Sequence, residues 1–264
     1  MQWHIRLLTI WGAALTVAAA HGGERYEGLA YARQGGALLY TETHWVHEQG
    51  GAVEHAVLYR CPDGSPFAWK RLLAGAGPQA PDFEFVDARD GYREGARTTA
   101  SGGREVFVQP RDEAPLDVRP LRMPAGAVID AGFDAFVRGQ WGALNSGAAV
   151  TVPFLVPSRF DFWRFRIADA RDGRIDGQPV RMLRMRADAW YGFALPGIEL
   201  AYEPDGRRLV MFEGIGTIRD RQGRHLQVRI EFPKGQRLAL SGAADQAASA
   251  LALPLVRRCP GGAL

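Results

Sequence analysis

The fold class is decided by the stretch LQVRIEF, residues Leu226–Phe232. Apolar and polar side chains alternate across it, so an extended strand here buries one face and exposes the other. Other β-type segments recur at hairpin spacing from Ala37 onward, separated by turn signals such as Glu203–Gly206. The pattern predicts roughly ten strands in antiparallel hairpins, and therefore a mainly β protein.

One helix interrupts the strands, and we expect it over about residues 130–145. Asp130 stands where it can cap the first turn, and Asn145–Gly147 carries a stop signal. Apolar residues recur there at intervals of three and four and form one stripe: Phe133, Phe136, Val137, Trp141 and Leu144. The expected fold is mainly β (α+β), a strongly curved antiparallel sheet or half-barrel packed around one long amphipathic helix.

The first twenty residues have the layout of a cleavable secretory signal. Arg6 precedes the apolar run Leu7–Val17, and Ala18–Ala20 supplies the small residues that signal peptidase accepts. The apolar run is shorter than the ~20 residues needed to cross a bilayer, and no later segment has the pattern of a transmembrane helix. We therefore expect a signal peptide over residues 1–20, cleavage after Ala20, and a periplasmic or secreted mature chain.

Composition divides the rest of the chain into three parts. Residues 21–36 are rich in glycine and charge and are expected to form a flexible lead. Residues 37–240 are expected to form a single β-rich domain, with Pro110–Pro124 as the best candidate for a hinge. Residues 241–264 form an alanine-rich C-terminal tail, in which a short helix over Ala243–Leu253 is expected.

Cys61 and Cys259 are the two cysteines of the chain. In an oxidising compartment such a pair can form one disulfide between the body of the domain and its tail. Two separate thiols are the alternative, because the spacing places no constraint on their geometry. Neither cysteine stands in a CxxC motif, so a redox role is not expected.

Charge and motifs argue against several classes of function. The net charge of +3 over 264 residues is too small to indicate nucleic-acid binding. The sequence has no phosphate-binding loop, nucleophile elbow, dinucleotide fingerprint or zinc-ribbon spacing, so no cofactor, metal or catalytic residue is predicted. His44 and His47 resemble a metal-binding pair, but residues three apart on a strand point to opposite faces.

Arginines crowd two neighbouring strands in the second half, beside several aromatic residues. One interpretation is an apolar cleft with a guanidinium rim, suited to an amphiphile with an anionic head. The alternative is a charged outer face whose arginines pair with Asp161, Asp169 and Asp172. The residues expected to line a pocket are Phe136, Trp141, Phe162, Trp163, Tyr202, Arg159 and Arg164.

Several motifs resemble those of an uncharacterised group of exported bacterial proteins. They are Gly132–Arg138 with Trp141 and Leu144, then Val156–Arg159, then Phe212–Gly214 leading to Ile218–Asp220 and Val228–Ile230. The resemblance covers most of residues 37–233 and implies a single exported domain. In architecture the chain is also similar to periplasmic lipoprotein-carrier half-barrels, in which a curved sheet covered by several helices shelters acyl chains.

Three functions from different classes remain open. The first is a non-catalytic periplasmic protein that binds or chaperones a hydrophobic or amphiphilic envelope component. The second is a structural or partner-binding envelope protein without a ligand pocket, acting through a sheet edge or an arginine-rich face. The third is a hydrolase, which needs a histidine to meet a carboxylate and a hydroxyl in one cleft. Its candidate histidines are His44, His47, His55 and His225. The expected partner is a lipid, an amphiphile or an envelope protein, and not nucleic acid.

Overall fold

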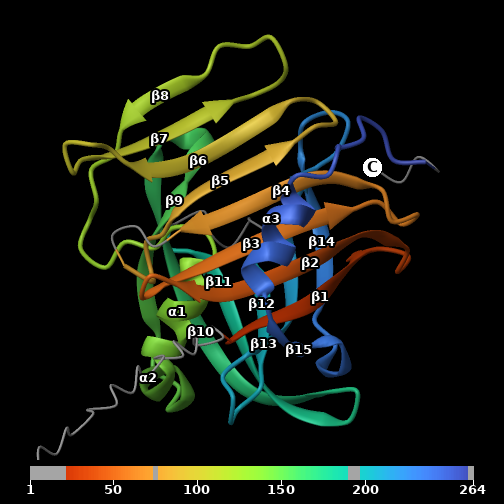
Figure 1. Ribbon diagram of the computed structural model, residues 1–264. Coiled ribbons are helices and arrows are strands. Elements are labelled where there is room, and N and C mark those ends of the chain that lie inside the picture. Colours follow the sequence, from red (N-terminus) through yellow and green to blue (C-terminus); the bar gives the residue numbers. More distant parts are fainter. Residues whose placement is uncertain (1–21, 74–76, 190–196, 261–264) are drawn as a thin grey trace, which may run out of the picture.

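The computed structural model describes residues 22–73, 77–189 and 197–260 (Figure 1). The expected signal peptide, residues 1–20, lies outside the described residues. The described chain forms an antiparallel sheet of fifteen strands with three short α-helices, which confirms the mainly β class. The first eight strands are β1 Gly22–Ala32, β2 Leu38–Gln49, β3 Ala52–Arg60, β4 Pro66–Leu73, β5 Asp82–Asp87, β6 Tyr92–Thr98, β7 Arg104–Gln109 and β8 Asp117–Pro120. The others are β9 Val150–Val156, β10 Asp161–Ile175, β11 Gln178–Ala187, β12 Ile198–Tyr202, β13 Leu209–Arg219, β14 His225–Glu231 and β15 Leu238–Ser241. The helices are α1 Gly132–Gly139, α2 Trp141–Asn145 and α3 Ala243–Leu251.

The sheet runs as a meander on each side of β1. Strands β2 to β8 follow in order on one side, and β14 back to β9 follow on the other. The two end strands, β8 and β9, do not pair with each other, so the curved sheet is not closed into a barrel. The outer edge of β9 is instead met by Val128, whose N–H donates to the Pro153 carbonyl at 2.8 Å and whose carbonyl accepts from Leu155 at 2.9 Å.

β1 shows that the flexible lead expected over residues 21–36 is wrong. It pairs with β2 along one edge, and with β15 and then β14 along the other. The glycines that suggested flexibility instead permit close packing. A Cβ on Gly28 would lie 2.8 Å from the Phe232 ring, and a Cβ on Gly23 would collide with Ala243. The glycines of this segment allow neighbouring elements to pack closely on β1, so the high glycine content does not indicate disorder.

β10 carries apolar side chains on both faces, because this end of the sheet is tucked against the other end. Phe162 packs into the large core cluster, which joins residues of β1–β7 to residues of β13 and β14, whereas Phe165 packs with α1 and α2. The turn Pro157–Arg159 between β9 and β10 contacts β6 and β7. The β9–β10 pairing stays in register throughout, so no bulge produces this change of face. The sheet thus overlaps itself as a spiral does.

The single long helix expected over residues 130–145 is wrong, because two short helices, α1 and α2, occupy it. The backbone leaves the helical conformation at Gln140, between Gly139 and Gly142, whose low helix propensity favours a break. Asp130 is also not the N-cap residue; it has a φ of 46°, and its carboxylate binds Lys70. The apolar stripe is core as expected, and it packs on the inner face of β9–β12.

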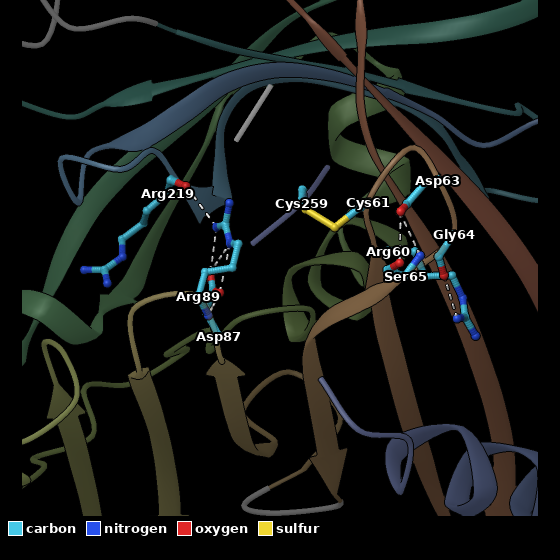
Figure 2. The surroundings of a disulfide bond; sticks show 9 residues. All are labelled: Arg60, Cys61, Asp63, Gly64, Ser65, Asp87, Arg89, Arg219 and Cys259. Carbon is cyan, nitrogen blue, oxygen red and sulfur yellow. Dashed lines mark hydrogen bonds and ion pairs between the residues drawn. A yellow bond between two sulfur atoms is a disulfide. The ribbon is translucent and has the colours of Figure 1, made fainter. Parts of the chain in front are cut away.

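The C-terminal tail folds back across the outer face of the sheet, where α3 lies in front of β2 and β3 in Figure 1. Alanines of α3 pack on Trp45 and Leu58. A disulfide joins Cys61, just after β3, to Cys259, with the two Cα atoms 5.5 Å apart (Figure 2). This confirms the first of the two alternatives for the cysteines. No helix in the described ranges is long and apolar enough to span a membrane.

Two short strands were not expected from the sequence. β8 lies inside Pro110–Pro124, the candidate hinge, and ends the sheet with all four residues exposed. β15 pairs with the first half of β1 and is also largely exposed. Neither strand has an alternating apolar pattern, because neither buries one face, and so hydrophobic periodicity does not reveal them.

Candidate functional site

Charged side chains line part of the inner face of the sheet, which also carries the main aromatic core. Tyr40, Glu42 and His44 occupy alternating positions of β2 on this face, and each is at most 7% exposed. Lys70 on β4 and Glu94 on β6 are equally buried. We call one set of residues the inner polar wall: Glu42, His44, His55, Lys70, Glu94 and Asp130. Burying these charges costs free energy that only hydrogen-bonded partners offset.

Glu42, His44 and His55 form a hydrogen-bonded chain within this wall. Nε2 of His44 lies 3.0 Å from a carboxylate oxygen of Glu42, and Nδ1 lies 2.9 Å from Nε2 of His55 on β3. Burial, followed by the nearby positive charges, lowers the pKa of His55 well below its usual value. His55 is therefore neutral at pH 7 and can donate from Nε2 to His44, while His44 donates to the Glu42 carboxylate.

A stack of three planar groups connects this chain to Arg237, in the segment between β14 and β15. The ring of Tyr26 lies on that of His44, with centroids 4.4 Å apart and planes 6° apart. The Arg237 guanidinium packs on the Tyr26 ring as the third group of the stack, 4.0 Å from the ring centroid. Burial raises the pKa of the Tyr26 phenol, which stays protonated. Tyr26 and Arg237 are only partly buried, so this end of the stack reaches solvent.

Lys70 and Asp130 form the second part of the inner polar wall. Nζ of Lys70 donates to both carboxylate oxygens of Asp130, at 2.7 and 3.0 Å, and to the Thr217 hydroxyl at 3.3 Å. The lysine and aspartate side chains are 8% and 15% exposed. The pair joins β4 to the segment before α1 and to β13, so it ties the helices to both halves of the sheet.

Glu94 is the last member of the inner polar wall, and Tyr40 is a buried polar residue on the same face of the sheet. The Tyr92 hydroxyl donates to Glu94 at 2.7 Å, and burial raises the pKa of this carboxyl. Tyr40 is fully buried, and its hydroxyl has no hydrogen-bond partner among the described residues. Stacking and hydrogen bonds thus join Tyr26, His44, His55 and Glu42, whereas Lys70 with Asp130 and Glu94 with Tyr92 form two separate bonded groups.

An open depression of about 360 Å³ adjoins the Arg237 end of the stack. Its lining comes from the start of β1, from β15 and from the two turns beside them: Gly23, Glu24, Arg208, Lys234, Arg237 and Ala239. A second open depression, of about 260 Å³, lies elsewhere, on β1, β13 and β14. It is lined by Tyr31, Ala32, Arg33, Gly36, Glu213, Arg229 and Glu231.

The residues expected to line one pocket lie in several places. Trp141 packs edge-on against Tyr202, with Phe136 in the same core cluster under the helices. Phe162 packs into the other cluster, on the first half of the sheet. Trp163 lies beside the guanidinium of Arg159, at 5.9 Å, and the exposed Arg164 lies 3.5 Å from Asp188. Neither depression is lined by any of these seven residues.

Several arginines of β10 and β11 pair with acids, but of the three expected partners only Asp172 forms an ion pair among the described residues. Arg181 lies 2.8 Å from Asp172, and Arg171 and Arg184 both bind Glu199. Such solvent-accessible pairs contribute little to stability.

The histidines of the proposed metal-binding pair are on opposite faces, as expected. His44 lies in the inner polar wall, and His47 lies 3.8 Å from Glu54 on the other face. Within the described residues, no three histidine, cysteine or acidic side chains are placed to hold a metal ion. His225 binds the Gly216 carbonyl.

No protein-family model and no curated protein sequence matches the chain. Among solved structures, it is similar to a β-barrel-like protein of domain of unknown function DUF1849 from Brucella abortus. The TM-score is 0.50 at 11% identity, over 83% of this chain and 98% of that chain. A DUF1329 family protein from Desulfovibrio piger matches with a TM-score of 0.25 at 11% identity, over 84% and 83%. The expected likeness to barrel-like proteins of unknown function is confirmed at the level of fold.

Proposed function

We propose that this chain is an exported, non-catalytic protein that binds or chaperones a hydrophobic or amphiphilic component of the cell envelope. The binding region lies where the stack of Arg237, Tyr26 and His44 adjoins the depression lined by Arg237. One observation carries the proposal: the partly exposed Tyr26 stacks on the buried His44, which is hydrogen-bonded to the buried Glu42. Such charges cost stability, and strongly perturbed groups of this kind cluster at functional sites.

Export is supported by the disulfide as well as by the signal peptide that the sequence predicts over residues 1–20. Cysteine pairs persist as disulfides in oxidising compartments and are rare in the cytoplasm. The Cys61–Cys259 bond holds the tail that carries α3, and this tail covers the outer face of β2 and β3. The inner polar wall lies on the other face of these strands.

A non-catalytic role agrees with the bonding of His44 and His55. Both ring nitrogens of His44 are engaged, by Glu42 and by His55. Neither ring bonds to a serine or threonine hydroxyl among the described residues, and nucleophilic hydrolysis requires such a hydroxyl beside its base. The hydrolase hypothesis thus lacks its nucleophile in this part of the chain.

Native mass spectrometry of the mature protein with single-chain amphiphiles, each below its micelle concentration, tests the proposal. We expect a one-to-one complex with an amphiphile of ~14 methylenes, since burial of each methylene is worth about 0.8 kcal/mol. A head group without a chain serves as the control and should give no complex of comparable stability. Absence of any amphiphile complex would overturn the proposal.

A second function, partner binding, is favoured by one observation at the other end of the sheet. β8 ends the sheet, and no described strand pairs with its outer edge. Val118 on β8 and Leu116 just before it are 37% and 39% exposed. An edge of this kind can accept a strand from another protein. A Val118→Lys variant that loses an envelope partner, but keeps amphiphile binding, would establish this second role.

A further inference from the structure

We propose that the depression lined by Arg208, Lys234 and Arg237 binds the anionic head group of the amphiphile, a phosphate or carboxylate. The inference rests on the proposed function and specifies the chemistry of its ligand. It places the head group in the depression beside Arg237, which lines the depression and also stacks on the Tyr26 ring.

The charges around the depression leave an excess of positive charge. Three cationic side chains face two carboxylates, those of Glu24 and Glu203. The second depression provides a comparison, because its two arginines face two glutamates and its charges balance. An anion therefore gains net attraction at the first depression and none at the second.

Two of the three cationic side chains, Arg237 and Arg208, are fixed by neighbouring residues, whereas Lys234 is mobile. Fixed guanidinium groups are suited to binding an oxyanion. Arg237 is only 19% exposed and is fixed between Tyr26 and Glu24, whose carboxylate accepts a hydrogen bond from it at 2.7 Å. Glu203 holds Arg208 through two nitrogens, at 2.8 and 2.6 Å. A preset guanidinium offers paired donors to a phosphate or carboxylate with little loss of side-chain entropy.

Lys234 is the mobile member of the set. Its side chain is 72% exposed, and Nζ lies 3.6 Å from Glu203, which is too long for a hydrogen bond. It can move onto an arriving anion without breaking a hydrogen bond within the protein. Its exposure also means that the side chain can be replaced without loss of packing, which makes it the position for a test.

Isothermal titration calorimetry at low salt tests the site with three probes of matched chemistry. The first is a lysophosphatidylglycerol, the second a lysophosphatidylcholine with the same acyl chain, and the third inorganic phosphate. The variant is Lys234→Glu. The matched control is Arg224→Glu, which reverses an exposed charge beyond the far end of β13, roughly 35 Å from Arg208 along an eleven-residue strand.

We expect Lys234→Glu to weaken binding of the anionic amphiphile at least tenfold and to leave the zwitterionic one unchanged. Arg224→Glu should change neither. Inorganic phosphate alone should bind weakly, and tight binding of it would overturn the amphiphile as ligand while keeping the anion site. Equal binding of both amphiphiles, or no effect of Lys234→Glu, would overturn the anion site but not the proposed function. Failure of every amphiphile to bind would overturn both.

Discussion

Lys70→Met is expected to destabilise the protein strongly, because it removes one partner of a buried ion pair. Nζ of Lys70 lies 2.7 and 3.0 Å from the two carboxylate oxygens of Asp130, and both side chains are at least 85% buried. Methionine matches the length of the lysine stem, so the substitution leaves little empty space. It leaves the Asp130 carboxylate in the core without its cation.

The size of the effect follows from the desolvation of that carboxylate. Removing one member of a buried pair costs about 3–5 kcal/mol, whereas replacing both members is often nearly neutral. We therefore expect Lys70→Met to lower the free energy of unfolding by ~3–5 kcal/mol, and Lys70→Met with Asp130→Asn to recover most of this loss. Asparagine is chosen because Asp130 has a φ of 46°, which asparagine tolerates.

Urea unfolding at pH 7, followed by circular dichroism and tryptophan fluorescence, measures these differences. The control is Arg71→Met on the neighbouring position of β4, where a pair with Glu54 is half exposed and is worth about 0.2–1 kcal/mol. The reasoning would be refuted if Lys70→Met cost no more than Arg71→Met. It would also be refuted if the double variant were as unstable as the single one, because the cost would then not come from the unpaired carboxylate.

Three further predictions concern the disulfide and two groups of the inner polar wall. Cys259→Ala should lower stability by about 2–5 kcal/mol, and a reducing agent should reproduce this in the native chain but not in the variant, measured by thermal unfolding. The folded-state pKa of His55 is lowered, so the neutral ring stabilises the folded state. This contribution to stability is fully present above the unfolded-state pKa of 6.5 and is lost as pH falls below it. His55→Gln should therefore flatten the fall in urea midpoint between pH 6.5 and 5, and an unchanged slope would contradict this. The folded-state pKa of Glu94 is raised, so stability is lost as pH rises through the folded pKa; Glu94→Gln should be more stable than the native chain at pH 8 and closer to it at pH 4.

The strands with one buried face could be predicted from the sequence, because alternation records burial directly. β14 begins and ends one residue before the expected LQVRIEF stretch, and the apolar stripe of residues 133–144 is core. The break at Gln140 was missed, since hydrophobic spacing continues across it while the backbone does not. β1 was missed because its glycines serve contacts with Phe232 and Ala243, which lie far away in the sequence.

Most of the candidate site could not be predicted from the sequence, because its contacts also join residues that are far apart in the chain. Tyr40, Glu42 and His44 occupy alternate positions of β2 and therefore lie on one face, and this can be read from the sequence alone. The partners of the wall were not predictable, because Lys70 meets Asp130 and Tyr26 meets Arg237 only after the sheet curves. The expected pocket failed to assemble, because Phe162 and Phe165 on β10 face different core clusters. Sequence periodicity gives the face of each strand, but not which distant strand that face meets.

Hydrogen–deuterium exchange on the mature protein, with and without a saturating lysophosphatidylglycerol, tests the central claim most directly. Binding at the margin of the inner wall predicts slower exchange in Gly22–Tyr26 and Lys234–Ser241, around the depression, with β8 unchanged. Protection confined to β8, or no change anywhere at saturating amphiphile, would contradict the account.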